Sequence, residues 1–183
     1  ARLFRLLEKS WRHFFHRQKL PFLVVQLSSL NRPSWPEFRD SQRRLSAKLP
    51  ETWLTVTSDL GDSLDVHYRN KQPVGERLAL QALHHVYEHH LVSEGPTCIK
   101  ARAVDNLVYL YFENAHGLQA KGGAVQGFEV AGDDGVYYAA KAEIEGESVI
   151  VSSDKVPNPR AVRYGWQPFT RANLINSASL PCS

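Results

Sequence analysis

The sequence predicts a chain in two parts, an α/β part followed by an all-β part. Over residues 1–92, helical periodicities alternate with continuous apolar runs of strand length, as in a doubly wound layer of helices and parallel strands. Over residues 97–183 the runs become short and alternating, with turn signals between them, which is typical of an antiparallel β-sandwich. The segment "SEGPT" at 93–97 marks the boundary. We therefore expect one domain in residues 1–92 and another, with an irregular tail, in residues 97–183.

The α/β part begins with a helix and a buried strand. Apolar side chains recur at three- and four-residue steps over about residues 2–18, which predicts an amphipathic helix. Pro21 ends this helix, and the apolar run "PFLVVQL" at 21–27 has the length of a strand. A continuous apolar run is typical of a strand that is buried on both faces, as in a parallel sheet.

The same alternation continues through a second helix, a second strand and a third helix. The second helix is expected from Ser34 or Trp35 to about Lys48, with a proline in its first turn. The β-branched run "TWLTVTSD" at 52–59 predicts the second strand. The third helix is expected over about residues 71–90, where it would bury Val74, Leu78, Ala82, Leu83 and Val86.

This predicted sheet is incomplete, because two parallel strands need neighbours on both edges to be stable. The chain also contains no Met, and its first residues, "ARLFRLLEKSWRHFF", lack the cleavage site of a signal peptide. We therefore expect a fragment or processed piece that begins at Ala1, with the other strands supplied by the missing N-terminal part of the same protein or by a partner chain. The lack of a signal peptide then says nothing about the parent's compartment.

The all-β part should contain six or so strands. Turn signals at Asp133–Gly135 and Glu145–Glu147 predict hairpins between neighbours. The expected strands cover residues 98–104, 106–115, 127–132, 136–146, 148–153 and 161–166. Aromatic side chains in these strands are interpreted as core, with a sugar-stacking platform as the alternative.

Charge and hydropathy exclude two classes of partner. The first 50 residues hold 11 Lys and Arg against 3 Asp and Glu, whereas the remainder holds 11 against 16. Because the basic side chains are spread over helix faces, without stacking aromatics between them, we interpret them as solvated surface and expect no nucleic-acid partner. No apolar run approaches the ~18 residues of a membrane span, so we expect no membrane association.

The cysteines and histidines indicate no metal site. Cys98 and Cys182 lie 84 positions apart, so free buried thiols are expected, although pairing of either one with a missing segment stays open. His85 and His89, within "HHVYEHH", fit a zinc pattern in which two histidines lie one helical turn apart. No segment follows that would supply a third ligand, so we predict no metal.

The loop "DLGDSLDVHYRNK" at 59–71 carries the chemistry that the sequence suggests. Gly61–Leu64 spells the nucleophile motif of one esterase class, which would make Ser63 a nucleophile. His67, four residues later on the same loop, leaves little room for an acyl group between the two side chains. The alternative is that His67 acts as a base for a serine located elsewhere. A histidine just past a strand's carboxyl end lies where open α/β sheets keep their sites.

The block "VTSDLGDSLDVHYRNKQPVGERLALQAL" resembles the carboxyl-terminal catalytic block of the sialate O-acetylesterase family, which are SGNH-type carbohydrate esterases. The resemblance extends to "FLVVQLSSL" and "WPEFRDSQ" upstream, and to "GFEVAGDDGVYYAAKAEIEGESVIVSS" and "VRYGWQPFTRANLINSASLP" downstream. It implies the C-terminal part of an SGNH-type three-layer α/β/α domain, followed by an antiparallel β-sandwich. It also implies a secreted, periplasmic or lysosomal parent.

In that resemblance His67 is the general base, and Ser63 falls in a variable part of the loop. Asp65 is the first candidate for the acid that orients the histidine ring. The wider SGNH pattern places the acid three residues before the histidine, where this chain has Leu64, so Asp62 is the second candidate. Tyr68 replaces the family's usual proline. Further candidates for the substrate cleft are Gln26, Trp35, Arg39 and Asn70.

The family's nucleophilic serine lies in a Gly-Gln-Ser-Asn-like segment, and a Gly-Glu-Ser-Asn-like segment helps to form its oxyanion hole. Neither segment occurs in residues 1–183, so the chain alone is expected to be nearly inactive. The implied reaction removes acetyl groups from an O-acetylated sugar or sialic acid through a serine acyl-enzyme, with no cofactor. The competing hypothesis is a non-catalytic accessory or carbohydrate-binding module with a degenerate hydrolase remnant.

Overall fold

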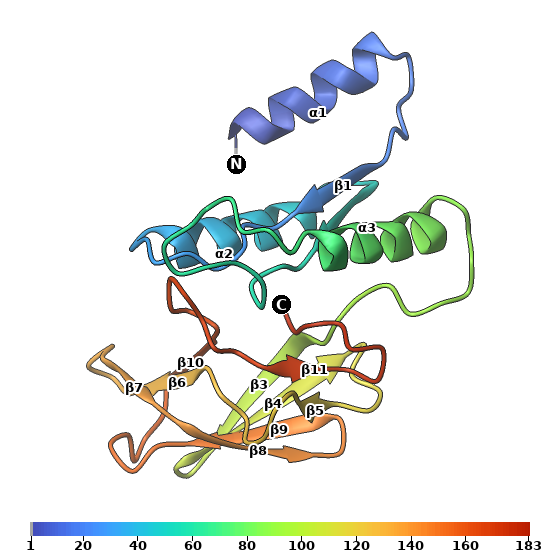
Figure 1. The fold of residues 1–183 in the computed structure, drawn as a ribbon. Coiled ribbons are helices and arrows are strands. Elements are labelled where there is room, and N and C mark those ends of the chain that lie inside the picture. The colour runs from blue at the N-terminus through green and yellow to red at the C-terminus, as the bar shows by residue number, and fades with distance from the viewer. Residues whose placement is uncertain (1) are drawn as a thin grey trace.

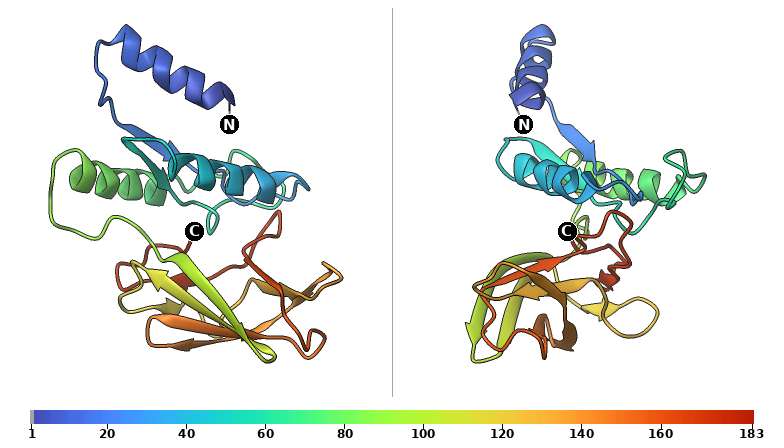
Figure 2. Two further views of the ribbon diagram at one scale, coloured as in Figure 1. Left: turned by 180° about the vertical axis from the view of Figure 1, so that it is seen from behind. Right: turned by 90° about the vertical axis from the view of Figure 1, so that its left-hand side faces the viewer.

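The computed structural model describes residues 2–183, in which three helices and a pair of parallel strands precede three antiparallel sheets (Figure 1). A helix, α1, lies at one end of the molecule and the antiparallel strands lie at the other. Two helices and a pair of parallel strands form the layer between them, as all three views show (Figures 1 and 2). The elements of the first half are α1 (Arg2–Phe14), β1 (Phe22–Val25), α2 (Trp35–Ser46), β2 (Thr52–Thr55) and α3 (Gln72–His85).

The parallel arrangement expected for the first two strands is confirmed. Phe22 of β1 pairs with Thr52 of β2, and the register continues to Val25 and Thr55. Both α2 and α3 pack against this pair. Within residues 2–183 the parallel sheet has these two strands alone, so a complete three-layer α/β/α domain stays a prediction.

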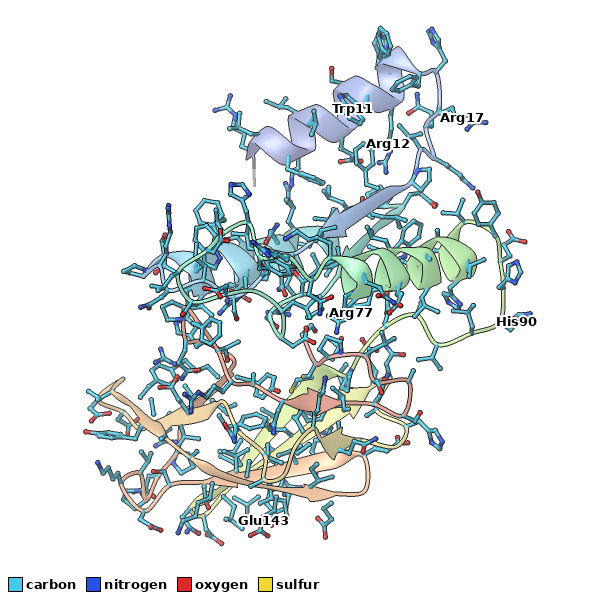
Figure 3. The ribbon with its side chains drawn as sticks, viewed as in Figure 1. Trp11, Arg12, Arg17, Arg77, His90 and Glu143 are labelled. Atoms are coloured by element: carbon cyan, nitrogen blue, oxygen red, sulfur yellow. The ribbon has the colours of Figure 1, made fainter. Side chains whose placement is uncertain are left out.

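Helix α1 is confirmed, but it ends at Phe14 and leaves its apolar face exposed. The most exposed of these side chains are Leu3 at 81% and Phe14 at 73%. Instead, α1 buries Glu8 and Arg12, which form an ion pair with each other. The Arg12 guanidinium, which lies between α1 and β1 (Figure 3), also donates to the backbone carbonyls of Leu20 and Pro50.

The third helix is shorter than the sequence predicts, because it ends at His85 rather than near residue 90. Glu88 has a left-handed backbone with φ of 60°, and His89 donates its N–H to the carbonyl of Leu83 at 2.9 Å. A left-handed residue just beyond the last turn is a common way for a helix to end. Val86, expected to be buried, is 41% exposed as a result.

The antiparallel strands form a four-stranded sheet, a three-stranded sheet and a two-stranded sheet. Their strand orders are β3-β4-β9-β8, β10-β6-β7 and β11-β5. The strands are β3 (Thr97–Val104), β4 (Leu107–Glu113), β5 (Gln119–Ala120), β6 (Phe128–Ala131), β7 (Tyr137–Ala139), β8 (Lys141–Glu145), β9 (Ser148–Ser152), β10 (Ala161–Tyr164) and β11 (Leu174–Ile175). Both predicted hairpins, β6–β7 and β8–β9, are confirmed.

The single strand expected at 136–146 is in fact two strands, which belong to different sheets. Its first part, β7, pairs with β6, whereas its second part, β8, pairs with β9. Residue Ala140 lies between the two and packs against a shared hydrophobic core. The buried members of this core include Leu110 of β4, Val130 of β6, Val149 of β9 and Leu174 of β11. The chain therefore passes from one sheet to the other at a point where the sequence contains no turn residues.

The structure also bears on membranes and metals. In residues 2–183 no helix has the length and apolar character needed to cross a membrane. The described part of the chain also holds no group of three or more His, Cys, Asp or Glu side chains placed to bind a metal ion. His85, one member of the zinc pattern, instead stacks on Trp53 with ring centroids 4.4 Å apart, and it contacts Glu94. Both cysteines are free thiols, but only Cys182 is buried.

Candidate active site

The loop that carries His67 begins at the carboxyl end of β2 and lies beside the segment that follows β1. Ser29 and Gly61 form a parallel bridge beyond the ends of the two strands. The Ser29 N–H donates to Leu60 at 2.8 Å, and the Asn31 N–H donates to Ser63 at 3.1 Å. The loop thus extends the parallel pair and starts at the sheet edge where open α/β folds place their sites.

Gly61 makes this close approach possible. Its φ is +119°, and a Cβ atom at this position would lie 2.2 Å from the carbonyl oxygen of Ser29. A side chain here would push the loop away from the sheet edge, because the atom it meets belongs to the backbone and has no freedom to swing aside.

We expect Gly61→Ala to lower the free energy of unfolding by about 2 kcal/mol or more, through backbone strain and loss of the bridge to Ser29. Gly75→Ala is the matched control, since an added Cβ on α3 meets nothing within 4 Å. That control should raise stability by up to about 1 kcal/mol, because alanine favours a helix interior. Urea unfolding of the two variants measures the difference in stability. Equal midpoints would show that the close approach of Gly61 to Ser29 does not restrict the side chain at position 61.

An ion pair holds the start of the loop. Arg77 of α3 donates from Nη1 to Asp59 Oδ1 at 2.7 Å and from Nη2 to Asp59 Oδ2 at 2.6 Å. Its Nη1 also donates to the carbonyl of Val56 at 2.9 Å. A two-pronged pair of this kind fixes geometry as well as adding energy. The pair therefore sets how α3 and the loop lie relative to each other.

The two candidate acids both organise the loop backbone. Asp62 Oδ1 accepts from the N–H groups of Leu64 and Asp65, at 2.8 Å and 3.1 Å. These two bonds hold the pKa of the Asp62 carboxyl below its usual value. Asp65 Oδ1 accepts from the backbone N–H of His67 at 2.7 Å. Each carboxylate thus closes a tight turn of the type that aspartate favours.

The His67 side chain is exposed, and so is that of Asn70 on the same loop. Asp65 reaches the backbone of His67 rather than its ring in this conformation. Tyr68, the residue after His67, lies under the Lys71 ammonium, which is 3.2 Å from the ring centroid. The roles of His67 as base and of Asp65 or Asp62 as its partner stay predictions.

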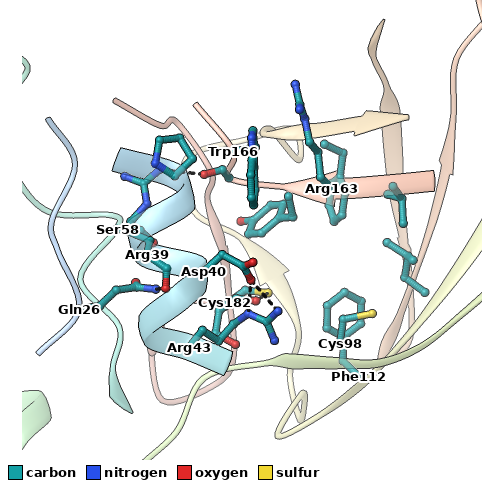
Figure 4. A pocket seen from close by; sticks show the side chains of 17 residues that line it. Gln26, Arg39, Asp40, Arg43, Ser58, Cys98, Phe112, Arg163, Trp166 and Cys182 are labelled. Atoms are coloured by element: carbon teal, nitrogen blue, oxygen red, sulfur yellow. Dashed lines mark hydrogen bonds and ion pairs between the residues drawn. The ribbon is translucent and has the colours of Figure 1, made fainter. Parts of the chain in front are cut away.

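The other candidates for the substrate cleft make their side-chain hydrogen bonds to parts of the chain outside this loop. Trp35 donates its indole N–H to the carbonyl of Ser28 at 2.8 Å. Arg39 is 4% exposed and donates to the carbonyls of Gly165, Gln167 and Pro168 in the chain's tail. Gln26 and Arg39 line one cavity of about 280 Å³, shown in Figure 4, whose described walls include no residue of 59–71.

The sequence pointed to the loop but not to the residues that hold it. Asp59 and Arg77 lie 18 positions apart, and nothing in either local pattern shows that they meet. Both residues lie in the block that resembles the sialate O-acetylesterase family. Their presence together in that block is the one feature of the sequence that could have indicated this ion pair. Arg39 stays a predicted cleft residue; its hydrogen bonds tie α2 to the tail, and it also lines the cavity.

Comparison with known proteins finds solved structures that are similar to this chain. No protein-family model matches the chain, and no curated protein matches it. A crystal structure of a carbohydrate acetylesterase from Xanthomonas citri matches it with a TM-score of 0.89 and 41% sequence identity. The match covers 96% of this chain and 43% of that protein, so the chain spans less than half of its neighbour's length. The neighbour supports the resemblance to carbohydrate esterases, and the mixed α/β fold with several antiparallel sheets is consistent with it.

Proposed function

We propose that the chain is part of a carbohydrate esterase that hydrolyses acetyl esters on sugars. The observation that carries this proposal is the likeness to a carbohydrate acetylesterase over 96% of the chain at 41% identity. The position of His67 on an exposed loop after a parallel strand is compatible with it, since such loops hold the sites of open α/β folds.

In the proposed mechanism His67 removes the proton from a serine hydroxyl as the serine oxygen attacks the ester carbonyl. The proton passes to the departing sugar oxygen, and an acetyl-serine remains. His67 then takes a proton from water, whose oxygen attacks the acetyl group, and acetate leaves as the serine regains its proton. Asp65, or alternatively Asp62, holds the ring and stabilises its charged form.

We further propose that the serine and the oxyanion donors lie outside residues 1–183, in the remainder of the same protein or in a partner chain. Two features support an additional covering segment: the apolar face of α1 is exposed, and the parallel sheet has two strands within the described residues. The completed unit would be a three-layer SGNH-type domain of the sialate O-acetylesterase type. O-acetylated sugar or sialic acid would be its substrate, in a secreted, periplasmic or lysosomal protein.

A covalent serine probe tests where the nucleophile lies. The protein that contains this chain with its flanking sequence is treated with a fluorophosphonate, digested and mapped by mass spectrometry. We expect the label on a serine outside residues 1–183 and none on Ser63, with loss of acetate release in proportion to labelling.

Label on Ser63 would restore that residue as the nucleophile and overturn the assignment. An unlabelled protein that binds sugars and releases no acetate would instead favour the accessory carbohydrate-binding module. Treating residues 1–183 alone supplies the comparison, because this piece is expected to take up no label at all.

A further inference from the structure

The three-stranded sheet β10-β6-β7 has one face in the hydrophobic core and one face turned outward. Val130 of β6 is fully buried, and Tyr138 of β7, its cross-strand partner, packs against the same core. Successive side chains of a strand point to opposite faces, so Glu129, Arg163 and Tyr137 lie on the other, outward face. That face therefore carries acidic, basic and aromatic side chains.

Arg163 is at the centre of this group. Its Nε donates to Glu129 Oε2 at 2.9 Å, and its Cζ lies 3.9 Å from the centroid of the Tyr137 ring. The side chains of Arg163 and Glu129 are half-buried, with 29% and 17% exposed. A guanidinium that stacks on a ring and is paired at one edge is held in one orientation. Its other edge is therefore presented in a fixed direction.

Several polar atoms of this group have no partner among the described residues. Arg163 donates from neither Nη atom to any residue of 2–183, and Glu129 Oε1 accepts from none. These atoms are also absent from the buried, unpaired polar atoms of the described chain, so solvent or a ligand can reach them. The N–H groups on both Nη atoms and one carboxylate oxygen are thus available to a ligand.

Trp166 adds a second ring and a further donor beside Arg163. Its ring centroid lies 5.8 Å from Arg163 Cζ, and in Figure 4 both side chains point the same way, away from the middle of the cavity. The indole N–H is neither buried nor bonded to a described residue. Arg39 donates to the carbonyls on either side, those of Gly165 and Gln167, and so holds the backbone of Trp166 in place.

We propose that Arg163, Glu129 and Trp166 bind a neutral sugar unit of the carbohydrate on which the esterase acts. Neighbouring hydroxyl groups of the sugar accept from the Arg163 Nη atoms and donate to Glu129 Oε1. A C–H face of the same ring packs on the indole of Trp166. The choice of a sugar rests on the proposed function, whereas the location rests on the accessible, unpaired donors and acceptor.

The charge balance of this site favours a neutral sugar over an acidic one. Glu129 already neutralises Arg163, and Arg160, just before β10, pairs in the same way with Asp133. A sugar carboxylate bound at Arg163 would lie close to the Glu129 carboxylate, and such a contact between like charges lowers affinity. Hydroxyl groups suit both members of the pair, because a hydroxyl can accept and donate.

Calorimetric titration of the protein that contains this chain tests the proposal. The ligands are unacetylated tetrasaccharides of β-1,4-linked glucose, xylose and mannose, with tetragalacturonate as the acidic comparison. At least one neutral tetrasaccharide should bind with a Kd of about 1 mM or tighter. Tetragalacturonate should bind at least about fivefold more weakly, because its carboxylates are repelled by Glu129.

Two substitutions locate the site, and each is chosen to preserve the fold. Arg163→Lys keeps the positive charge beside Glu129 but removes the forked donors, and Trp166→Phe keeps a ring but removes the indole N–H. Each should weaken binding at least about fivefold. Arg160→Lys, the same change in an exposed ion pair, should leave the affinity unchanged. Circular dichroism checks folding, and either variant decides the matter if the other does not fold.

The proposal is overturned if no neutral tetrasaccharide binds, if tetragalacturonate binds as tightly as the best neutral one, or if either folded variant keeps the affinity of the unchanged protein. These results are separable from failure of the proposed function. His67→Ala should lower acetate release and leave this binding intact. A protein that binds the sugar through Arg163 but releases no acetate would contradict the esterase alone.

Discussion

Replacing His67 by alanine in the protein that contains this chain is expected to lower kcat/KM for acetate release by at least about 10²–10⁴-fold. The reason is that the serine hydroxyl then has no base to accept its proton and the sugar oxygen no acid to donate one. The exposed side chain of His67 makes few packing contacts, so stability should change little. Acetate released from an acetylated sugar, measured at fixed pH, is the readout.

His116→Ala is the matched control, because its side chain is 92% exposed and belongs to the antiparallel part of the molecule. That variant and Ser63→Ala should retain activity near that of the unchanged protein. If Ser63→Ala abolished acetate release while His67→Ala retained it, the serine of the loop would be the nucleophile and the proposed mechanism would be wrong.

The same assay distinguishes the two candidate acids. Asp65→Asn and Asp62→Asn each retain an oxygen that accepts the loop's backbone N–H bonds, so the turns should persist. The variant that removes the true partner of His67 should lose at least about tenfold in kcat, and the other should lose little. Equal, small effects would mean that an acid outside this loop orients the ring.

The hydrogen bonds from Arg39 to the tail are expected to contribute strongly to stability. Arg39→Met should lower the free energy of unfolding by about 3–5 kcal/mol, because it removes the Arg39 donor from the carbonyls of Gly165 and Gln167 and leaves the Pro168 carbonyl with the Leu30 N–H alone. Burial lowers the pKa of Arg39 to about 10, so the guanidinium is still charged at neutral pH and its three bonds are charge-assisted. The methionine side chain restores apolar volume but no donor.

Arg44→Met serves as the control on the same helix. Its side chain is 65% exposed and pairs with Asp40, which also pairs with Arg43, so the loss of Arg44 should change stability far less than the loss of Arg39. Urea unfolding curves compare the two variants under identical conditions. If both unfolded at the same urea concentration, the contacts of Arg39 with the tail would contribute nothing measurable, and the two halves of the molecule would be held together by other contacts.

The order and type of the helices, the two parallel strands and most antiparallel strands followed from local patterns, whereas β5, β11 and the division of 136–146 into two strands did not. Three- and four-residue spacing identified the helices, and continuous apolar runs identified the two parallel strands, because both signals depend only on which face of an element is buried. Turn residues likewise located two of the hairpins among the described residues, β6–β7 and β8–β9. The loop at 59–71 is marked by its Gly61–Leu64 tetrapeptide and by a histidine just past a strand, and its resemblance to a catalytic block favours His67 over Ser63.

The sequence alone therefore predicts the helices, the two parallel strands and most of the antiparallel strands, and it marks one loop for a catalytic test. Only the folded structure shows that α1 buries Glu8 and Arg12 rather than its apolar face, and that Arg39 binds the tail. Gln26 and Arg39 also line a cavity that no local pattern indicates. These contacts join side chains to backbone carbonyls and buried surfaces far away in the chain. Every residue carries a carbonyl, so no local pattern marks which one a distant side chain will reach.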